Sequence, residues 1–262
     1  MARLHEYQGK AILQQYGIPI PEGAIADSPS QAVDIARQIG KPVVVKAQIW
    51  TTSRAGQNLI HFANTPQEVE SIARDLLGKQ VDNFRVEQLL IEEQVSIAQE
   101  FYLGMIINDT ARAPMLIFSS VVGSCVEEIS QQHPDKLQQT VVDIHTGLQS
   151  FQAIDLARRA GISGKLLLQL GSIISRFYQS ARQSDARTAE INPLAVTSDG
   201  KLIALDARFT IDDYAAYRHP EMQIEIAREF DRNPTPLEMI AWNVEKNDYR
   251  GTFYFIQMET DF

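Results

Sequence analysis

The sequence contains one cysteine, Cys125, among 262 residues. A single thiol excludes both an internal disulfide and a zinc site built from cysteines, and it fits a reducing compartment. The five histidines do not make up for this scarcity, because none of their spacings is typical of a zinc site. They are His5, His61, His133, His145 and His219.

Long apolar runs and an excess of basic residues are also missing. The longest apolar stretches fall far short of the roughly 20 residues that span a bilayer. The N-terminus carries acid and base where a signal peptide needs an apolar core, so we expect a cytoplasmic protein without a membrane segment. The formal net charge of −9 argues against nucleic acid as a partner, because phosphate backbones bind to basic patches.

Two common catalytic motifs are absent as well. No Gly-x-x-x-x-Gly-Lys-Ser/Thr loop is present, and no Gly-x-Ser-x-Gly nucleophile elbow. The sequence therefore excludes the commonest phosphate-binding loop and the α/β-hydrolase type of catalysis.

What is present predicts an α+β protein. A hydrophobic fraction of 44% allows a full core in one large domain or two joined smaller ones. Apolar periodicity and capping residues predict helices over 5–16, 28–39, 65–77 and 165–182. The pattern also predicts strands over 42–47 and 85–92, a last strand over 251–256, and hairpins pairing 100–108 with 113–120 and 187–197 with 201–209.

The second hairpin carries the most informative polar residues. Asn192 and Asp206 each lie seven residues from Asp199 in the turn, so a symmetrical register sets them opposite each other. Carboxylate and amide oxygens suit Mg²⁺, which usually takes one or two protein ligands and completes its shell with water and phosphates. Alternatively, Asn192 and Pro193 form a strand-end bulge and Asp206 is an ordinary acid at the end of a strand.

Further candidates lie elsewhere in the chain. Lys46 ends an all-valine strand, where a lysine is either a phosphate-binding point charge or simply solvated. Residues 51–56, including Ser53 and Arg54, offer hydroxyls, N–H groups and a guanidinium to an anion, or form a polar loop. Glu92 and Glu100 are either surface acids or carboxylates that face a ribose or a metal.

Taken in order, several segments resemble one known family. They read LHEYQ from Leu4, YGIP from Tyr16, VVKAQ from Val44, EFYLG from Glu100, EINPL from Glu190 and LDAR from Leu205. This set resembles the nucleotide-binding half of the succinyl-CoA synthetase β subunit, an ATP-grasp ligase, over about residues 3 to 256.

The resemblance implies a fold and a site. It implies two α+β subdomains that clasp a nucleotide: residues 1–22 with 104–240 bear the metal hairpin, residues 23–103 form a lid, and 241–262 lead toward a further domain. Asn192 and Asp206 would hold Mg²⁺, Lys46 would touch phosphate, and Glu92 and Glu100 would lie in the nucleotide cleft. Ser53 and Arg54 would belong to the phosphate loop. Pro21 stands where ATP-using members tend to have proline and GTP-using members glutamine, which favours ATP.

The implied reaction needs a partner. In the family, a histidine on an α subunit is phosphorylated and passes the phosphate to a carboxylate, which coenzyme A then captures. No histidine of this chain takes that part, so we expect no catalytic residue here. We expect an α subunit as partner. The family's C-terminal flavodoxin-like domain is expected either from a separate polypeptide or to have been lost by truncation.

Two departures keep other functions open. The family's glycine-rich phosphate loop reads TTSRAGQN from Thr51, and each added Cβ hinders close backbone approach to phosphate. A second glycine-rich motif is only partly matched at residues 121–127. The chain is therefore a ligase component, a non-catalytic nucleotide-binding relative, or another ATP-grasp enzyme that forms an acyl phosphate.

Overall fold

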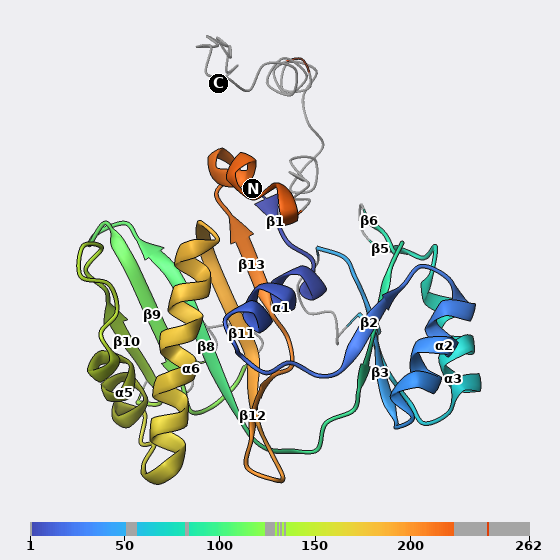
Figure 1. Cartoon of the computed structure of the whole chain (residues 1–262), viewed down its shortest axis with the longest axis horizontal. Coiled ribbons are helices and arrows are strands. Elements are labelled where there is room, and N and C mark those ends of the chain that lie inside the picture. Colours follow the sequence, from blue (N-terminus) through green and yellow to red (C-terminus); the bar gives the residue numbers. More distant parts are fainter. Residues whose placement is uncertain are drawn as a thin grey trace. The chain divides into compact units, whose positions relative to one another are not determined.

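The computed structural model describes residues 2–50, 57–81, 84–123 and 135–222, together with Ile129, Gln131, His133 and Ile240. Within these residues every strand pair is antiparallel, as the hairpins of the sequence predict (Figure 1). The strand predicted over 251–256 lies outside the described residues. None of the described helices has the length and apolar character needed to cross a bilayer.

The larger sheet has the order β1-β13-β11-β8-β9-β10, with β12 also paired to β11, so seven of the described strands join it. Their bounds are β1 Ala2–Arg3, β8 Ile97–Asn108, β9 Ala113–Ser119, β10 Leu137–Val141, β11 Ala186–Thr197, β12 Leu202–Ala204 and β13 Arg208–Ile211. Three helices pack their apolar sides against this sheet and form its core: α1 Glu6–Gln15, α5 Ser150–Arg159 and α6 Gly164–Gln183.

The smaller sheet has the order β2-β7-β3-β4. Its strands are β2 Gly23–Ala26, β3 Val43–Ala47, β4 Ile60–Ala63 and β7 Leu89–Glu93. Two helices, α2 Pro29–Ile39 and α3 Pro66–Leu76, pack side by side on it (Figure 1). A separate short ribbon pairs β5 Gln80–Val81 with β6 Phe84–Arg85, and the 3-10 helices η1 Asp213–Arg218 and η2 Pro220–Met222 follow β13.

Local signals explain why these helices start and stop where they do. The α1 helix begins with a capping box, in which the backbone N–H of His5 donates to Oε1 of Gln8 at 2.8 Å. The α2 helix has Pro29 in its first turn and ends at Gly40, whose φ of 66° is the left-handed conformation that glycine adopts without strain. The helices predicted over 5–16, 28–39, 65–77 and 165–182 are thus confirmed.

Two elements differ from the expectation. The strand predicted over 85–92 is only partly a strand, because Val86 exchanges backbone bonds with Gly78 and Lys79, next to the β5–β6 ribbon, and β7 begins at Leu89. The second strand of the predicted 187–197/201–209 hairpin is split into β12 and β13, and residues 205–207 between them leave the ladder. That interruption frees the backbone around Asp206 to face a cavity.

Candidate functional site

A cavity of about 750 Å³ brings the sequence candidates together. This cavity, called the cleft below, has the size of a small-molecule site. It is lined by Pro21, Val44, Lys46, Ile60, Phe62, Glu92, Glu93, Gln94, Val95, Ile97, Glu100, Gly123, Glu190, Asn192, Pro193, Leu205, Asp206, Ala207 and Arg208. Both sheets contribute to the lining, and residues 94–96, the crossing segment, connect them.

All the described candidates from the sequence lie along the cleft. They are Pro21, Lys46, Glu92, Glu100, Asn192 and Asp206. Ser53 and Arg54 lie outside the described residues. The cavity places these side chains together, and the ligand of each one stays a prediction.

The hairpin register accounts for the position of Asn192 and Asp206. Leu194 faces Ala204 on one side of the interruption, and Glu190 faces Arg208 on the other. The same register therefore continues across the gap and sets Asn192 opposite Asp206, as the count from the turn predicts. The backbone N–H of Leu205 also donates to the carbonyl oxygen of Pro193 at 3.0 Å, which holds the two chains together here.

The Asn192 side chain is oriented by its own hydrogen bonds. Its Nδ2 donates to the carbonyl oxygen of Gly123 at 3.2 Å and to Oε1 of Glu190 at 3.1 Å. Because the amide nitrogen is used in this way, Oδ1 is the atom that remains to bind a cation. The peptide bond that follows, between Asn192 and Pro193, is cis.

An amide oxygen and a carboxylate are hard oxygen donors, which fit Mg²⁺. Among the described residues, no group of three or more His, Cys, Asp or Glu side chains could hold a metal by itself. A cation that takes only one or two protein ligands and completes its shell with water and phosphate needs no such group. The donor set at Asn192 and Asp206 therefore fits magnesium better than a metal that requires a full protein cage.

A buried cluster of four charges lies beside this pair. Lys10 Nζ lies 2.6 Å from both carboxylate oxygens of Glu92 and 2.8 Å from Oε1 of Glu6. Lys46 Nζ lies 2.8 Å from Oε1 of Glu6 and 2.9 Å from Oε2 of Glu92. The side chains of these four residues, the buried quartet, are at most 10% exposed, so two ammonium groups and two carboxylates neutralise one another away from water.

The two lysines of the buried quartet respond differently to burial. For Lys46, burial alone would lower the pKa, but the carboxylates of Glu6, Glu92 and Asp206 outweigh it and raise the pKa above its ordinary value. For Lys10, burial is again the largest effect, and here it lowers the pKa despite the attraction of Glu6 and Glu92, since Lys46 repels it. Lys46 is thus the lysine held firmly as a cation at the edge of the cleft.

Sequence reasoning missed part of this site. It did not single out Lys10 or Glu6, although their spacing of four in a helix places them on one face. It also missed Arg208, which lies opposite Glu190 on the cleft side of the larger sheet. Nothing local marks Arg208, because only the paired register brings it to the cavity.

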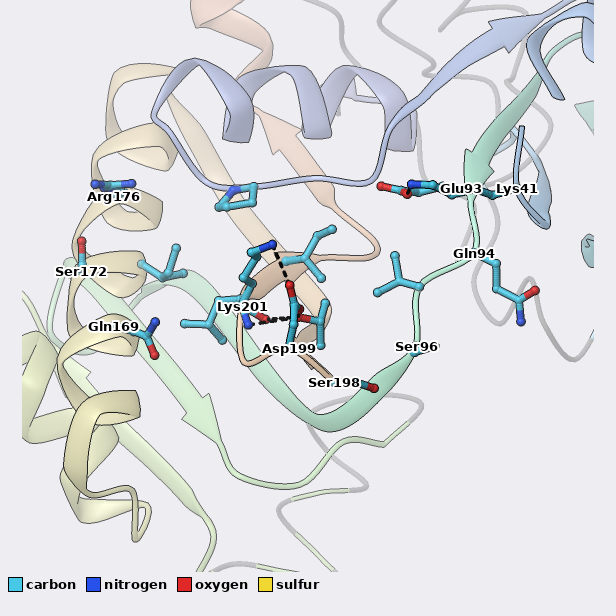
Figure 2. A pocket seen from close by; sticks show the side chains of 16 residues that line it. Lys41, Glu93, Gln94, Ser96, Gln169, Ser172, Arg176, Ser198, Asp199 and Lys201 are labelled. Carbon is cyan, nitrogen blue, oxygen red and sulfur yellow. Dashed lines mark hydrogen bonds and ion pairs between the residues drawn. The ribbon is translucent and has the colours of Figure 1, made fainter. Parts of the chain in front are cut away.

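Figure 2 shows a second cavity, of about 800 Å³. Glu93, Gln94 and Val95 line both the cleft and this cavity. Its charged side chains bind one another: Lys41 lies 2.9 Å from Glu93, and Lys201 lies 2.6 Å from Asp199. Arg176, on α6, donates to the carbonyl oxygen of Gly17 at 2.7 Å. These internal partners account for its cations, and we assign no ligand to it.

Known proteins with similar sequences point to one family. A family model described as the ATP-grasp domain matches residues 3–196. The GDP-forming succinate–CoA ligase β subunit of Thermus thermophilus is 38% identical over 219 residues, which cover 84% of this chain and 58% of that protein. The ADP-forming β subunit of Ignicoccus hospitalis is 34% identical over 258 residues, covering 98% of this chain and 65% of that protein. The chain thus spans less than two thirds of either relative.

Solved structures show the same fold at low sequence identity. ATP citrate lyase of Methanothrix soehngenii, in complex with citrate and coenzyme A, has a TM-score of 0.69 and 17% identity, covering 94% of this chain and 60% of that chain. The dinucleotide-forming acetyl-coenzyme A synthetase 1 of Candidatus Korarchaeum cryptofilum has a TM-score of 0.66 and 18% identity, covering 80% of this chain and 94% of that chain.

Proposed function

The chain belongs to the ATP-grasp domain family, and we propose that it is a relative of the succinyl-CoA synthetase β subunits and the nucleotide-binding component of an acid–CoA ligase. One observation carries the proposal: the cleft brings the buried Lys46 and the oxygen donors of Asn192 and Asp206 into one cavity of nucleotide size. A cation and a metal site at one cavity are what a triphosphate requires.

The side chains would divide the work as follows. Asn192 and Asp206 would hold Mg²⁺, which neutralises charge on the phosphate oxygens when it is bound. Lys46, kept protonated by its neighbouring carboxylates, would attract the same oxygens. Glu100 and Glu92 would border the nucleotide, and Ser53 and Arg54 would contribute to the phosphate loop. We propose two subdomains as the resemblance implies, with one change of boundary: all of β8 pairs within the larger sheet, so the lid ends at the crossing segment and not at residue 103.

The reaction proposed for this site is phosphoryl transfer to a partner. The bond between the γ-phosphorus and its bridging oxygen breaks, a bond to a histidine nitrogen of an α subunit forms, and the nucleoside diphosphate leaves. A carboxylate oxygen then takes the phosphoryl group as the bond between histidine nitrogen and phosphorus breaks, and the coenzyme A thiol attacks the resulting acyl phosphate, which forms the thioester and releases inorganic phosphate. The chain spans less than two thirds of its relatives, and we propose that the later steps need the parts of those relatives that this chain does not match.

The nucleotide itself is proposed from Pro21, which lines the cleft. The relatives named above include one GDP-forming and one ADP-forming subunit, so overall similarity does not decide the base. Proline at this position favours ATP. A Pro21→Gln variant should raise the ratio of GTP affinity to ATP affinity about tenfold, which is a modest change of about 1.4 kcal/mol in relative binding.

Calorimetric titration with Mg-ATP tests nucleotide binding. The wild-type chain should bind with an affinity that depends on Mg²⁺, and Asp206→Ala should lose that dependence. Asp199→Ala, in the turn of the same hairpin and outside the cleft, is the matched control and should bind like the wild type. Absence of binding by the wild-type chain at millimolar Mg-ATP would refute the proposal.

A second candidate function is favoured by the altered phosphate loop. With TTSRAGQN in place of a glycine-rich loop, the chain would bind nucleotide as a sensor or stabilising subunit without transferring phosphate. An assay with γ-labelled ATP and a candidate α subunit separates the two. Label on the partner histidine supports the ligase component, whereas tight binding without label supports the non-catalytic relative. A third candidate function is that of another ATP-grasp enzyme that forms an acyl phosphate.

A further inference from the structure

Phe62 is a large aromatic side chain that the fold leaves in water. It lies on β4, the last strand in the order of the smaller sheet, and 64% of its surface is exposed. It also lines the cleft. Exposing an aromatic ring costs the free energy that its burial would provide, so a side chain left open inside a cavity points to an apolar ligand surface.

The register of the sheet places Phe62 relative to the phosphate-binding candidates. Val44 pairs with Phe62 on one side and with Glu92 on the other, while Lys46 pairs with Ile60. Phe62 and Lys46 therefore belong to neighbouring rows, two residues apart along the strands, and this step is about 7 Å. An extended ligand would fit with a flat group over the row that contains Phe62 and its phosphates over the row that contains Lys46.

The two rows lie toward opposite ends of the smaller sheet, and a different connecting segment follows each of them. Glu92, in the row of Phe62, is followed by Glu93 and the crossing segment. Lys46, in the other row, is followed by the connection between β3 and β4, which contains the predicted phosphate loop. With the phosphates over Lys46, the end of the sheet nearer the crossing segment is left for the base.

A second exposed apolar side chain meets the cleft from the other sheet. Ile97, at the start of β8, is 46% exposed and also lines the cleft. Phe62 and Ile97 thus present apolar surface from the smaller and the larger sheet respectively. Two such surfaces on the walls of one cavity suit a planar ring inserted between them.

We propose that Phe62 stacks on the nucleobase, with Ile97 on the opposite sheet, and so provides base affinity that does not depend on which purine is bound. The proposal rests on the proposed function and adds to it the residue that recognises the base. Every nucleobase has a π face, so stacking contributes similarly to ATP and GTP, while hydrogen bonds account for any preference between them.

Binding of three probes to four proteins tests this. The probes are Mg-ATP, Mg-GTP and magnesium tripolyphosphate, and the proteins are the wild type, Phe62→Ala, Phe62→Leu and Phe151→Ala. Phe151 is the matched control, because it is a phenylalanine 71% exposed on α5 that lines neither cavity described above.

Phe62→Ala should lower the affinity for ATP and for GTP by similar factors of about fivefold or more, and it should leave the affinity for tripolyphosphate unchanged. Phe62→Leu should fall between alanine and the wild type, because it keeps apolar cover but loses the π face. Phe151→Ala should bind all three probes like the wild type.

Three outcomes would overturn the assignment. ATP affinity unchanged in Phe62→Ala excludes stacking, and an equal loss for tripolyphosphate shows that Phe62 acts on the phosphate end or on the fold. A wild type that binds tripolyphosphate as tightly as ATP shows that the base contributes nothing, although the metal and phosphate site would stand. A wild type that binds none of the three probes refutes the proposed function as well.

Discussion

The ammonium nitrogen of Lys46 lies 2.6 Å from the carbonyl oxygen of Leu205, the residue before Asp206. This bond joins β3 of the smaller sheet to the interrupted strand of the larger one. An ammonium group has three N–H donors, and Glu6, Glu92 and Leu205 supply three acceptors for them. A phosphate that approaches Lys46 must therefore share or replace one of these acceptors.

Removing the Lys46 charge should destabilise the chain as well as weaken nucleotide binding. A Lys46→Met variant leaves Glu6 and Glu92 buried with one fewer cation, and breaking a buried ion pair costs about 3–5 kcal/mol. We expect a loss of that order in the free energy of unfolding, measured by urea denaturation. The double variant Lys46→Met/Glu6→Gln restores the charge balance and should recover part of the loss. A single variant as stable as the wild type contradicts the ionic description of the quartet.

The pH dependence of the same lysine follows from its raised pKa. Because the folded-state pKa of Lys46 lies above the unfolded value, its stabilising contribution is complete below the unfolded pKa of about 10.4 and is lost as the pH rises through the folded pKa. Because Lys46 also lowers the pKa of Lys10, the comparison is made in a Lys10→Met background, where Lys46 is the remaining lysine of the buried quartet. In that background, the stability difference caused by Lys46→Met should stay constant from pH 8 to 10. A difference that shrinks steadily over this range would mean that Lys46 titrates at or below its ordinary pKa.

Lys10 and Arg74 offer a contrast between a buried and an exposed ion pair at the same helical spacing. Lys10 pairs with Glu6 with side chains 2% and 1% exposed, whereas Arg74 pairs with Glu70 with side chains 68% and 45% exposed. Lys10→Met should lower the free energy of unfolding by about 3–5 kcal/mol, but Arg74→Ala by no more than about 0.5 kcal/mol. Equal losses in chemical denaturation would refute the distinction.

Asn192→Asp should make the stability of the chain sensitive to magnesium. The substitution replaces a donor that lies 3.1 Å from Oε1 of Glu190 with a second carboxylate, so like charges repel. Without a metal we expect a loss of about 1–3 kcal/mol in unfolding free energy. Millimolar Mg²⁺ should restore much of it, since a dication neutralises both groups. Recovery with K⁺ at equal ionic strength would indicate screening instead of binding.

Asp199, at the hairpin turn, should titrate well below its ordinary range. The ammonium of Lys201 and the hydroxyl of Thr197 bind its carboxylate and lower its pKa from 3.8 to about 2. Because the folded-state pKa is depressed, this stabilisation is present above the unfolded pKa and is lost as the pH falls toward 2. A carboxyl NMR titration should show this value, and Lys201→Ala should shift it back toward 3.8. An unchanged titration in the variant would assign the shift to other groups.

Local signals in the sequence determined several elements almost to the residue. Pro29 marks the start of α2 and Gly40 its end, and both act within one turn of the helix. Counting outward from Asp199 likewise predicted the hairpin register, in which Leu194 pairs with Ala204 and Glu190 with Arg208, because a tight turn fixes the register of its hairpin. By contrast, β10 and α5 were not predicted; β10 is a half-polar strand with a weak periodic signal.

The sequence by itself determined the local elements, the hairpin register and the residue types at the metal end of the cleft. Only the tertiary structure decided that Lys10 meets Glu92 and that Lys46 meets Glu6, since these pairs are 82 and 40 positions apart and come from α1, β3 and β7. It also decided that Phe62 stays exposed in a cavity. The physical reason is that burial and ion pairing depend on which segments pack together, and no short stretch of sequence specifies its distant neighbours.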